Sequence, residues 1–475
     1  ARLVAKGFTQ KIGQNYLETF SPVIAMDSIR LLLSLCAING WFIKQMDAKN
    51  AFLNGKLKYE TYFKPPNGCG AGNNEIWCLK KAMYGLKNAP LIFYHTFTNV
   101  LLKKGFESSK LDPCLLFHKK AKIYIAMYVD DLLIVSKEAK NIELTKSILS
   151  DAFEMKDLGI PTMFLGMTIK CINKNHIKIS MEDTINRIIK NYNITPVNRK
   201  YYSPMDKGFY PDNESSKLLN NEDHNKYRRY LGSLIYIANT IRLDIAYPVS
   251  LLSRYLEKPR QTHLKACERI MQYLIQTREI GLHYTNKKRC IIPSKDFRLI
   301  DTTKRPIISD FPNEGDLMVK TISDASYANE TGRYSQHGNI TYLNNNIIQW
   351  SSKKQNIVTL SSTEAEYVGL TEASKTNIFF VNLLKELQLN TTYGIVAGDN
   401  NSSLQLSSHK INHQRTKHID IRFHFIREKY LNKQFKLEYV NTENNVADCL
   451  TKVVNIPTSK RLNSLIFNIK YRENN

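Results

Sequence analysis

The sequence predicts a chain of mixed α and β structure with more than one domain, and three stretches carry this prediction. Residues 122–137 contain two short apolar runs rich in β-favouring residues, separated by Asp130 and Asp131. Residues 224–282 have mostly helical periodicity, and residues 318–399 combine strand-like segments with one long helical segment. The 475 residues are enough for about two to four domains.

The composition indicates a globular protein with an excess of positive charge. Hydrophobic residues make up 43%, and 67 Lys and Arg residues against 43 Asp and Glu residues give a net charge of +24. With 10% aromatic residues, this balance favours nucleic acid as a polyanionic partner, whereas the alternative is a basic surface that only maintains solubility. No apolar run reaches ~18 residues, which argues against a membrane span. The eight Cys residues form no CxxC pair, so neither a zinc site nor a disulfide framework is indicated.

In the first 197 residues, helices are expected over 28–38, 91–106 and 142–153, and a hairpin is expected over 163–180. Asp47 ends a strand-like segment, immediately before a possible helix start. Asp130 and Asp131 occupy a strand–turn–strand junction in an apolar setting, where two carboxylates are costly without a cation. Two Mg²⁺ ions would satisfy them, because Mg²⁺ prefers hard oxygen ligands. The alternatives are an exposed Asp-Asp turn and, for Asp47, a helix cap.

The remainder of the chain contains four further acids at the ends of predicted elements. Asp324 and Asp399 end strands, and Asp448 begins a short amphipathic helix. Glu364 and Glu366 lie near the start of a helix that Ser361 or Thr363 could cap, and because they point to nearly opposite faces, only Glu366 can face the sheet. Each acid taken singly is more often a cap or a surface group. If the four converge, they would hold two metal ions.

Many ordered motifs resemble those of a copia-type LTR retrotransposon Pol polyprotein, with a reverse transcriptase followed by a ribonuclease H. The motifs are ARLVAKGFTQ, ETFSPV, MDAKNAFLNG, MYGLKNAP, YVDDLL, FEMKDLG, FLGM, GSLIYIANT, SRYLEKP, WSSKKQ, LSSTEAEY, KHIDIRFHFIRE and ADCLTK. The resemblance implies an α+β right-hand polymerase (fingers/palm, helical thumb/connection) fused to an α/β ribonuclease H-like domain. It divides the chain into fingers and palm over 1–197, thumb or connection over 198–284, a linker or insertion over 285–317, ribonuclease H over 318–455, and a polar tail over 456–475.

The resemblance also implies a role for individual residues. The polymerase metal ligands would be Asp47, Asp130 and Asp131. The ribonuclease H ligands would be Asp324, Glu366, Asp399 and Asp448. Each site would use two Mg²⁺ (or Mn²⁺) ions. Phe52 resembles the steric gate that excludes a ribose 2′-hydroxyl, and the other substrate-binding candidates are Tyr84 and Gly85 at the incoming nucleotide, the primer grip Phe164, Leu165, Gly166 and Met167, and the basic fingers residues Arg2 and Lys6.

The implied partners are an RNA template, a DNA primer, their RNA–DNA hybrid and deoxynucleoside triphosphates, without a membrane. An integrase and a protease are expected upstream on the parent polyprotein, and the implied location is cytoplasmic, in a virus-like particle, or nuclear. The sequence departs from the family at Asn88, at IRLD (241–244) and at Glu443, and we expect further fingers sequence to precede residue 1. Two alternatives remain at this stage. One is a degraded or repurposed copy that binds nucleic acid without catalysis, and the other is an active ribonuclease H attached to an inactive polymerase.

Overall fold

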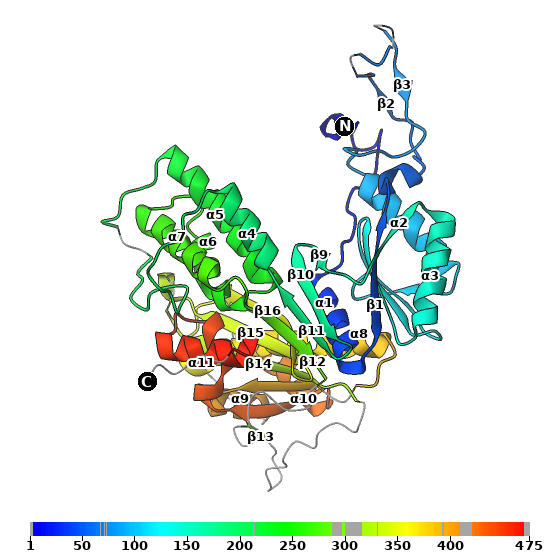
Figure 1. Ribbon diagram of the computed structural model, residues 1–475. Coiled ribbons are helices and arrows are strands. Elements are labelled where there is room, and N and C mark those ends of the chain that lie inside the picture. The colour runs from blue at the N-terminus through cyan, green and yellow to red at the C-terminus, as the bar shows by residue number, and fades with distance from the viewer. Residues whose placement is uncertain are drawn as a thin grey trace. The chain divides into compact units, whose positions relative to one another are not determined.

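The computed structural model describes residues 3–469 except 67, 71, 73, 212–213, 287–296, 300–315, 330, 392–393 and 409–419. The chain divides into two compact units, Ala1–Pro161 and Thr162–Asn475, and Figure 1 labels many of their elements. The boundary between the two units, after Pro161, lies earlier than residue 197, where the sequence predicts the end of the fingers and palm.

The first unit is built on a six-stranded antiparallel sheet in the order β4-β5-β6-β7-β1-β8. The strands of the expected hairpin are buried at nearly every position, which is the pattern of a central pair covered on both faces. The strands of this sheet are β1 (Phe42–Ala48), β4 (Glu107–Ser108), β5 (Leu115–His118), β6 (Ile123–Tyr128), β7 (Asp131–Ser136) and β8 (Met155–Gly159). A separate two-stranded ribbon pairs β2 (Tyr62–Phe63) with β3 (Trp77–Cys78).

Three helices accompany this sheet, close to the positions expected from periodicity. They are α1 (Met26–Asn39), α2 (Ala89–Leu102) and α3 (Ala139–Ala152). Helix α1 is buried at all positions from Ser28 to Ala37 and ends at Gly40, whose φ of 63° is readily adopted by glycine. Helix α3 packs against β7 and β1, and the Phe97 ring of α2 stacks on Phe153 at 5.6 Å between ring centroids. Short 3₁₀ helices cover Gly7–Thr9 (η1) and Ala51–Asn54 (η2).

The second unit begins with a four-stranded sheet in the order β12-β11-β10-β9 and with a group of helices. Its strands are β9 (Met163–Phe164), β10 (Met167–Asn173), β11 (His176–Ser180) and β12 (Gly281–Thr285), and its helices are α4 (Glu182–Asn191), α5 (Asn221–Thr240), η3 (Leu243–Ile245), α6 (Ala246–Ser253) and α7 (Gln261–Gln276). Helix α5 packs against both α6 and α7 (Figure 1). Arg242 and Asp244 form a buried ion pair (2.7 Å). Asp244 Oδ2 also accepts a hydrogen bond from the Tyr273 hydroxyl, so all three polar side chains have a partner.

A second six-stranded sheet follows, in the order β13-β18-β17-β14-β15-β16. Strands β14, β15 and β16 form an antiparallel meander, whereas β17 is parallel to both β14 and β18. The strands are β13 (Phe297–Leu299), β14 (Val319–Ser326), β15 (Gln336–Leu343), β16 (Asn346–Lys354), β17 (Gly394–Gly398) and β18 (Phe435–Val440). The connections contain α8 (Ser362–Glu386), η5 (Thr331–Arg333), α9 (Asn401–Ser408) and α10 (Asp420–Leu431), and the chain continues through η7 (Thr442–Asn444), η8 (Val446–Leu450) and α11 (Ile456–Phe467). The sheet and its helices agree with the α/β part of the predicted fold class.

Two regular elements lie in the stretches expected to be a linker and a polar tail. Within the expected linker 285–317, strand β13 pairs with β18 at the sheet edge, and much of the rest of that stretch lies outside the described residues. The expected polar tail contains helix α11, because Leu462, Ile466 and Phe467 share one face and are buried. The Asn463 amide on that helix donates to the Tyr273 hydroxyl (3.0 Å).

Candidate active sites

The first candidate site is the tight turn that joins β6 and β7. Tyr128 and Asp131 are register partners across it, and Val129 and Asp130 form the turn itself. Val129 has a φ of 56°, which a β-branched residue rarely adopts. Two-residue hairpin turns need a positive φ, which glycine or asparagine usually supplies, and strain of the kind that Val129 shows is concentrated at functional sites. The structure thus confirms the strand–turn–strand arrangement expected around Asp130 and Asp131.

Asp47 joins this turn through the neighbouring strand. Strand β1 pairs with β7 so that Asp47 lies directly opposite Asp131, and the Ala48 amide donates to the Asp130 carbonyl (2.9 Å). Directly paired residues of an antiparallel sheet project from the same face, so the two carboxylates are neighbours. The structure therefore brings Asp47 beside Asp130 and Asp131, which follow it by 83 and 84 positions in the sequence.

The charges of the two neighbouring acids act on Asp131. Burial, followed by the charges of Asp130 and Asp47, raises the pKa of Asp131 above its ordinary value, while a hydrogen bond from Gln45 lowers it. Gln45 is buried and was not singled out in the sequence, since one Gln in an alternating strand gives no signal. A hard cation at this face would offset the repulsion.

The aromatic candidates of the first unit also meet. The Phe52 ring, in η2, lies 4.7 Å from the Tyr84 ring and 6.5 Å from the Phe93 ring, measured between centroids. Phe52 is thus held in place by packing against two other aromatic rings. Gly85 has a local structural reason for lacking a side chain: its φ is +93°, and a Cβ there would lie 2.0 Å from the Ala5 carbonyl oxygen. Lys6 is exposed, and Arg2 lies outside the described residues.

The candidate primer grip is a tight turn between β9 and β10, in the second unit. Phe164 and Met167 are buried and anchor the turn, while Leu165 and Gly166 both have positive φ. The Gly166 carbonyl accepts a hydrogen bond from Thr184 Oγ1 (2.9 Å), and the Leu165 carbonyl accepts one from the Tyr236 hydroxyl. Helices α4 and α5 therefore fix the conformation of this turn.

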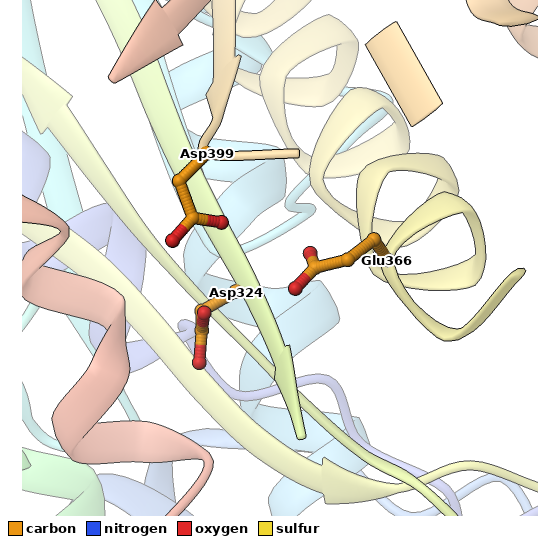
Figure 2. A group of neighbouring side chains, drawn as sticks. All are labelled: Asp324, Glu366 and Asp399. Carbon is orange, nitrogen blue, oxygen red and sulfur yellow. The ribbon is translucent and has the colours of Figure 1, made fainter. Parts of the chain in front are cut away.

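The second candidate site is formed by three acids that point toward one another (Figure 2). Asp324 lies in β14, Glu366 lies in α8, and Asp399 follows the end of β17. One oxygen atom from each carboxylate lies within 4.8 Å of the other two. Because β14 and β17 are parallel neighbours, their carboxyl ends lie side by side, and Asp324 and Asp399 are both located there. Among the described residues, this group alone brings three possible metal-ligand atoms within 4.8 Å of one another. The side-chain oxygens of Asp47, Asp130 and Asp131 do not all lie that close together.

The start of α8 explains why Glu366 rather than Glu364 joins the site. Ser361 caps the helix by accepting a hydrogen bond from the Glu364 amide (3.2 Å), and Glu364 Oε2 accepts one from the Leu360 amide (2.7 Å). This arrangement resembles a capping box, in which the glutamate side chain would accept from the amide of the N-cap residue, Ser361. Here it accepts from the amide of the residue before it, Leu360. Glu366 is 7% exposed and accepts a hydrogen bond from the Ala325 amide (3.2 Å). The prediction that only Glu366 faces the sheet is confirmed.

Asp448 lies in η8 and is also buried, at 8% exposure. Its Oδ1 atom is 2.9 Å from the Nζ atom of Lys452. The Asp448 charge acts on Asp324 and Asp399, so it belongs to the same electrostatic cluster although it is outside the group of three. The structure therefore places all four predicted acids around one site.

Three polar residues that support this site were missed by sequence reasoning. Thr451 Oγ1 donates to Asp324 Oδ2, and the Asn445 side-chain amide donates to the Ser323 carbonyl (3.1 Å), while Lys452 pairs with Asp448. The available signal was the sequence of η8 and its flanks, in which Asn445 precedes a short helix and Thr451 and Lys452 follow it. A short polar segment next to a candidate ligand is worth testing for second contacts, because such contacts orient ligands.

Burial dominates the electrostatics of the second site. Burial, reinforced first by the charge of Asp448, raises the pKa of Asp324 to about 7. Burial and the charge of Asp324 raise the pKa of Glu366 well above its ordinary value, and burial also raises the pKa of Asp399. The charged forms of Asp324, Glu366 and Asp399 are therefore disfavoured unless cations are nearby. Hard carboxylate oxygens are the donors that divalent metal ions such as Mg²⁺ prefer, so this donor set fits a divalent metal site.

Comparison with known proteins identifies the family of the chain. Residues 1–207 match the family described as "Reverse transcriptase (RNA-dependent DNA polymerase)", which defines the class of the first part of the chain. The chain as a whole belongs to the Pol polyproteins of copia-type retrotransposons. It is 36% identical over 466 residues to the Retrovirus-related Pol polyprotein from transposon TNT 1-94 of Nicotiana tabacum, covering 96% of this chain and 33% of that protein. It is 34% identical over 461 residues to the corresponding polyprotein from transposon RE1 of Arabidopsis thaliana, covering 95% of this chain and 29% of that protein.

A more distant relative is the Transposon Ty1-H Gag-Pol polyprotein of Saccharomyces cerevisiae, which is 26% identical over 97% of this chain and 25% of its own length. The chain thus spans about a third of the length of the curated relatives it matches, or less. Among solved structures, the foamy viral protease-reverse transcriptase in complex with RNA/DNA hybrid matches 86% of this chain and 45% of its own, at 15% identity and a TM-score of 0.45. Among the described residues, no helix is both long and apolar enough to cross a membrane.

Proposed function

We propose that this chain is an RNA-directed DNA polymerase that also cleaves the RNA strand of the RNA–DNA hybrid it makes. The observation that carries the proposal is the presence of two separate carboxylate sites on a chain of this family. One is the Asp47, Asp130 and Asp131 group at the β6–β7 turn, and the other is the buried cluster around Asp324. The net charge of +24 suits binding to template, primer and hybrid backbones.

In the polymerase site, Asp47, Asp130 and Asp131 would hold two divalent cations, Mg²⁺ or Mn²⁺. Bound there, the cations would activate the primer 3′-hydroxyl and stabilise the pyrophosphate leaving group. The Phe52 ring, held by Tyr84, would take the space of a ribose 2′-hydroxyl and so select deoxynucleoside triphosphates. We further propose Tyr84, Gly85, Arg2 and Lys6 as residues near the incoming nucleotide, and the turn Phe164–Met167 as the primer grip.

In the ribonuclease H site, Asp324, Glu366, Asp399 and Asp448 would hold the same cations. Bound there, they would activate the water that attacks the RNA phosphodiester and stabilise the leaving oxygen. Thr451 fixes the orientation of Asp324, and Ala325 fixes that of Glu366, through the hydrogen bonds described above. Buried carboxylates held in this way keep their donor geometry with little reorganisation.

We propose the functional division that the family motifs predict: fingers and palm over 1–197, thumb or connection over 198–284, linker or insertion over 285–317, and ribonuclease H over 318–455. This division assigns the proposed primer grip to the polymerase, although its residues belong to the second compact unit. The parent polyprotein would also carry an integrase and a protease. Its reverse transcription would take place in a cytoplasmic virus-like particle, with a nuclear stage.

One reaction tests both activities. An RNA template and an annealed DNA primer, each carrying its own label, are incubated with the full chain, the four deoxynucleoside triphosphates and Mg²⁺ or Mn²⁺. We expect primer extension and template cleavage together, and the loss of both when EDTA replaces the metal. Binding of the template–primer with neither reaction would contradict the proposal and support a non-catalytic copy. Cleavage without extension would support an inactive polymerase.

A further inference from the structure

Lys452 is a positive group in contact with the acids of the second site. Its Nζ atom lies 2.9 Å from Asp448 Oδ1, one helical turn away in sequence. The Asp448 side chain is 11% exposed, and the Lys452 side chain is 43% exposed, so its stem reaches from solvent to the buried acid. The Lys452 amide also donates to the Asp448 carbonyl (3.3 Å), which fixes the backbone from which the side chain extends.

The charge of Lys452 acts on the whole cluster and not on Asp448 alone. Burial lowers the pKa of Lys452, but the carboxylates of Asp324 and Asp448 outweigh burial and the pKa is raised, so the group remains an ammonium. In turn, its charge opposes the rise in the pKa of Asp324 and of Glu366. Lys452 is therefore a cation that belongs to the electrostatics of the carboxylate site.

We propose that Lys452 is a built-in counter-ion that competes with a divalent metal ion for Asp448 and so weakens metal binding at that acid. The inference rests on the proposed ribonuclease H function, because it takes Asp448 as a metal ligand. An Asp448 oxygen that lies 2.9 Å from an ammonium has to give up or lengthen that ion pair before it coordinates a metal ion. The ammonium also repels an incoming divalent cation, and its half-exposed, flexible stem allows it to move aside.

This role makes two predictions that an ordinary surface ion pair does not make. Removing the charge should tighten metal binding, because the competitor and the repulsion are both lost. It should also destabilise the metal-free protein, because the carboxylates then repel without a counter-ion. The Lys375–Glu372 pair on α8 is a matched control, since its Nζ–Oε1 distance is 2.8 Å and its lysine is 52% exposed.

The test is a Mn²⁺ titration of the full chain, with free Mn²⁺ followed by electron paramagnetic resonance. All proteins carry Asp130→Asn and Asp131→Asn, which remove metal ligands of the polymerase site. In this background we expect Lys452→Met to lower the Kd of the weaker Mn²⁺ on the order of tenfold, after allowing for solvent screening of a half-exposed charge. Lys452→Arg, which keeps the charge, and Lys375→Met should each change the Kd by less than about twofold.

Two results would overturn the inference. An unchanged Kd in Lys452→Met means that the lysine is only a surface partner of Asp448, and a higher Kd means that it holds Asp448 in place for the metal. A Glu366→Gln variant in the same background shows whether the measured Mn²⁺ binds at this site. If Mn²⁺ binding does not depend on Glu366, the proposed ribonuclease H centre itself is wrong, and the inference falls with it. Binding that depends on Glu366 but not on Lys452 refutes the inference alone.

Thermal unfolding provides the second readout and identifies a folding defect. In EDTA, Lys452→Met should unfold at a lower temperature than its parent, and saturating Mg²⁺ should remove that difference. A deficit of the same size with and without Mg²⁺ would show a purely structural role and contradict the proposal. Lys452→Gln provides an independent charge-free variant, and it should behave in the same way.

Discussion

The two carboxylate sites of this chain differ in how they are assembled. Asp130 and Asp131 are adjacent in one turn, and a single strand pairing brings Asp47 beside them. In contrast, Asp324, Glu366, Asp399 and Asp448 come from two strand ends, one long helix and one short 3₁₀ helix. The first site therefore depends on local sheet geometry, whereas the second depends on the packing of the whole α/β domain.

The sites also differ in burial. The three acids at the β6–β7 turn are half-buried, while Asp324, Glu366 and Asp448 are less than a tenth exposed. The second site consequently needs more support from neighbouring groups, and it has Thr451, Asn445 and Lys452. The comparison teaches that solvent helps to stabilise the clustered carboxylates at the first site, whereas hydrogen bonds and a lysine stabilise them at the second.

The largest expected effect tests which glutamate of α8 belongs to the second site. Glu366→Gln should lower RNA cleavage on the order of 10²–10⁴-fold, because a metal ligand contributes several kcal/mol to the transition state. Glu364→Gln, two positions earlier, keeps its acceptor for the Leu360 amide and should leave the cleavage rate nearly unchanged. A preformed RNA–DNA hybrid with labelled RNA provides the assay. Equal losses in the two variants would contradict the assigned faces of α8.

The next effect tests the shape of the polymerase site. Phe52→Val should raise the incorporation of ribonucleotides relative to deoxynucleotides by about 10–100-fold, because a smaller side chain leaves room for a 2′-hydroxyl. Single-nucleotide extension kinetics with each substrate measure the ratio. Phe63→Val, an aromatic change in β2 of the same unit, is the control. An unchanged ratio in Phe52→Val would show that another residue selects the sugar.

A smaller effect tests the support around the second site. Thr451→Val keeps the shape of the side chain but removes the donor to Asp324, so RNA cleavage should fall by about tenfold or somewhat more. Thr371→Val is the matched control, because Thr371 is also buried and its hydroxyl donates to the Tyr367 carbonyl within α8. Steady-state cleavage of the hybrid measures both. If Thr451→Val cleaves at the wild-type rate, the orientation of Asp324 does not depend on this hydrogen bond.

The smallest effect is a pH dependence of stability in the absence of metal. The pKa of Asp324 is about 7 in the folded state and about 3.8 in the unfolded state, so the folded state binds the proton more tightly. Stability should therefore fall as pH rises between about 4 and 7, by about 2–4 °C in Tm for each kcal/mol lost. Thermal unfolding in EDTA at pH 5 and pH 8 measures the difference, which Mg²⁺ at pH 8 should remove. If Asp324→Asn does not flatten this dependence, the burial argument fails.

The sequence predicted both sites to different depths. Adjacent acids between two apolar runs identified the Asp130–Asp131 turn, and helical geometry alone selected Glu366 over Glu364. The convergence of Asp324, Asp399 and Asp448 required the family resemblance, because no local pattern shows that strand ends 75 residues apart lie at one sheet edge.

What the sequence did not predict consists mainly of contacts between distant segments. Thr451, Asn445 and Lys452 are ordinary surface residue types, and their roles follow only from the position of η8 beside Asp324. The helical character of 456–467 was hidden by polar residues on one face, although Leu462 and Ile466 have helical spacing. The Gln45 contact to Asp131 was invisible for the same reason as Thr451.

The central claim, that two independent carboxylate sites carry two reactions, is tested most directly by a pair of single substitutions. Asp131→Asn and Asp399→Asn are each assayed for DNA synthesis on a primed RNA template and for cleavage of a preformed hybrid. Our account predicts that Asp131→Asn loses synthesis and keeps cleavage, while Asp399→Asn keeps synthesis and loses cleavage. Synthesis by Asp131→Asn, or intact hybrid cleavage by Asp399→Asn, would contradict it.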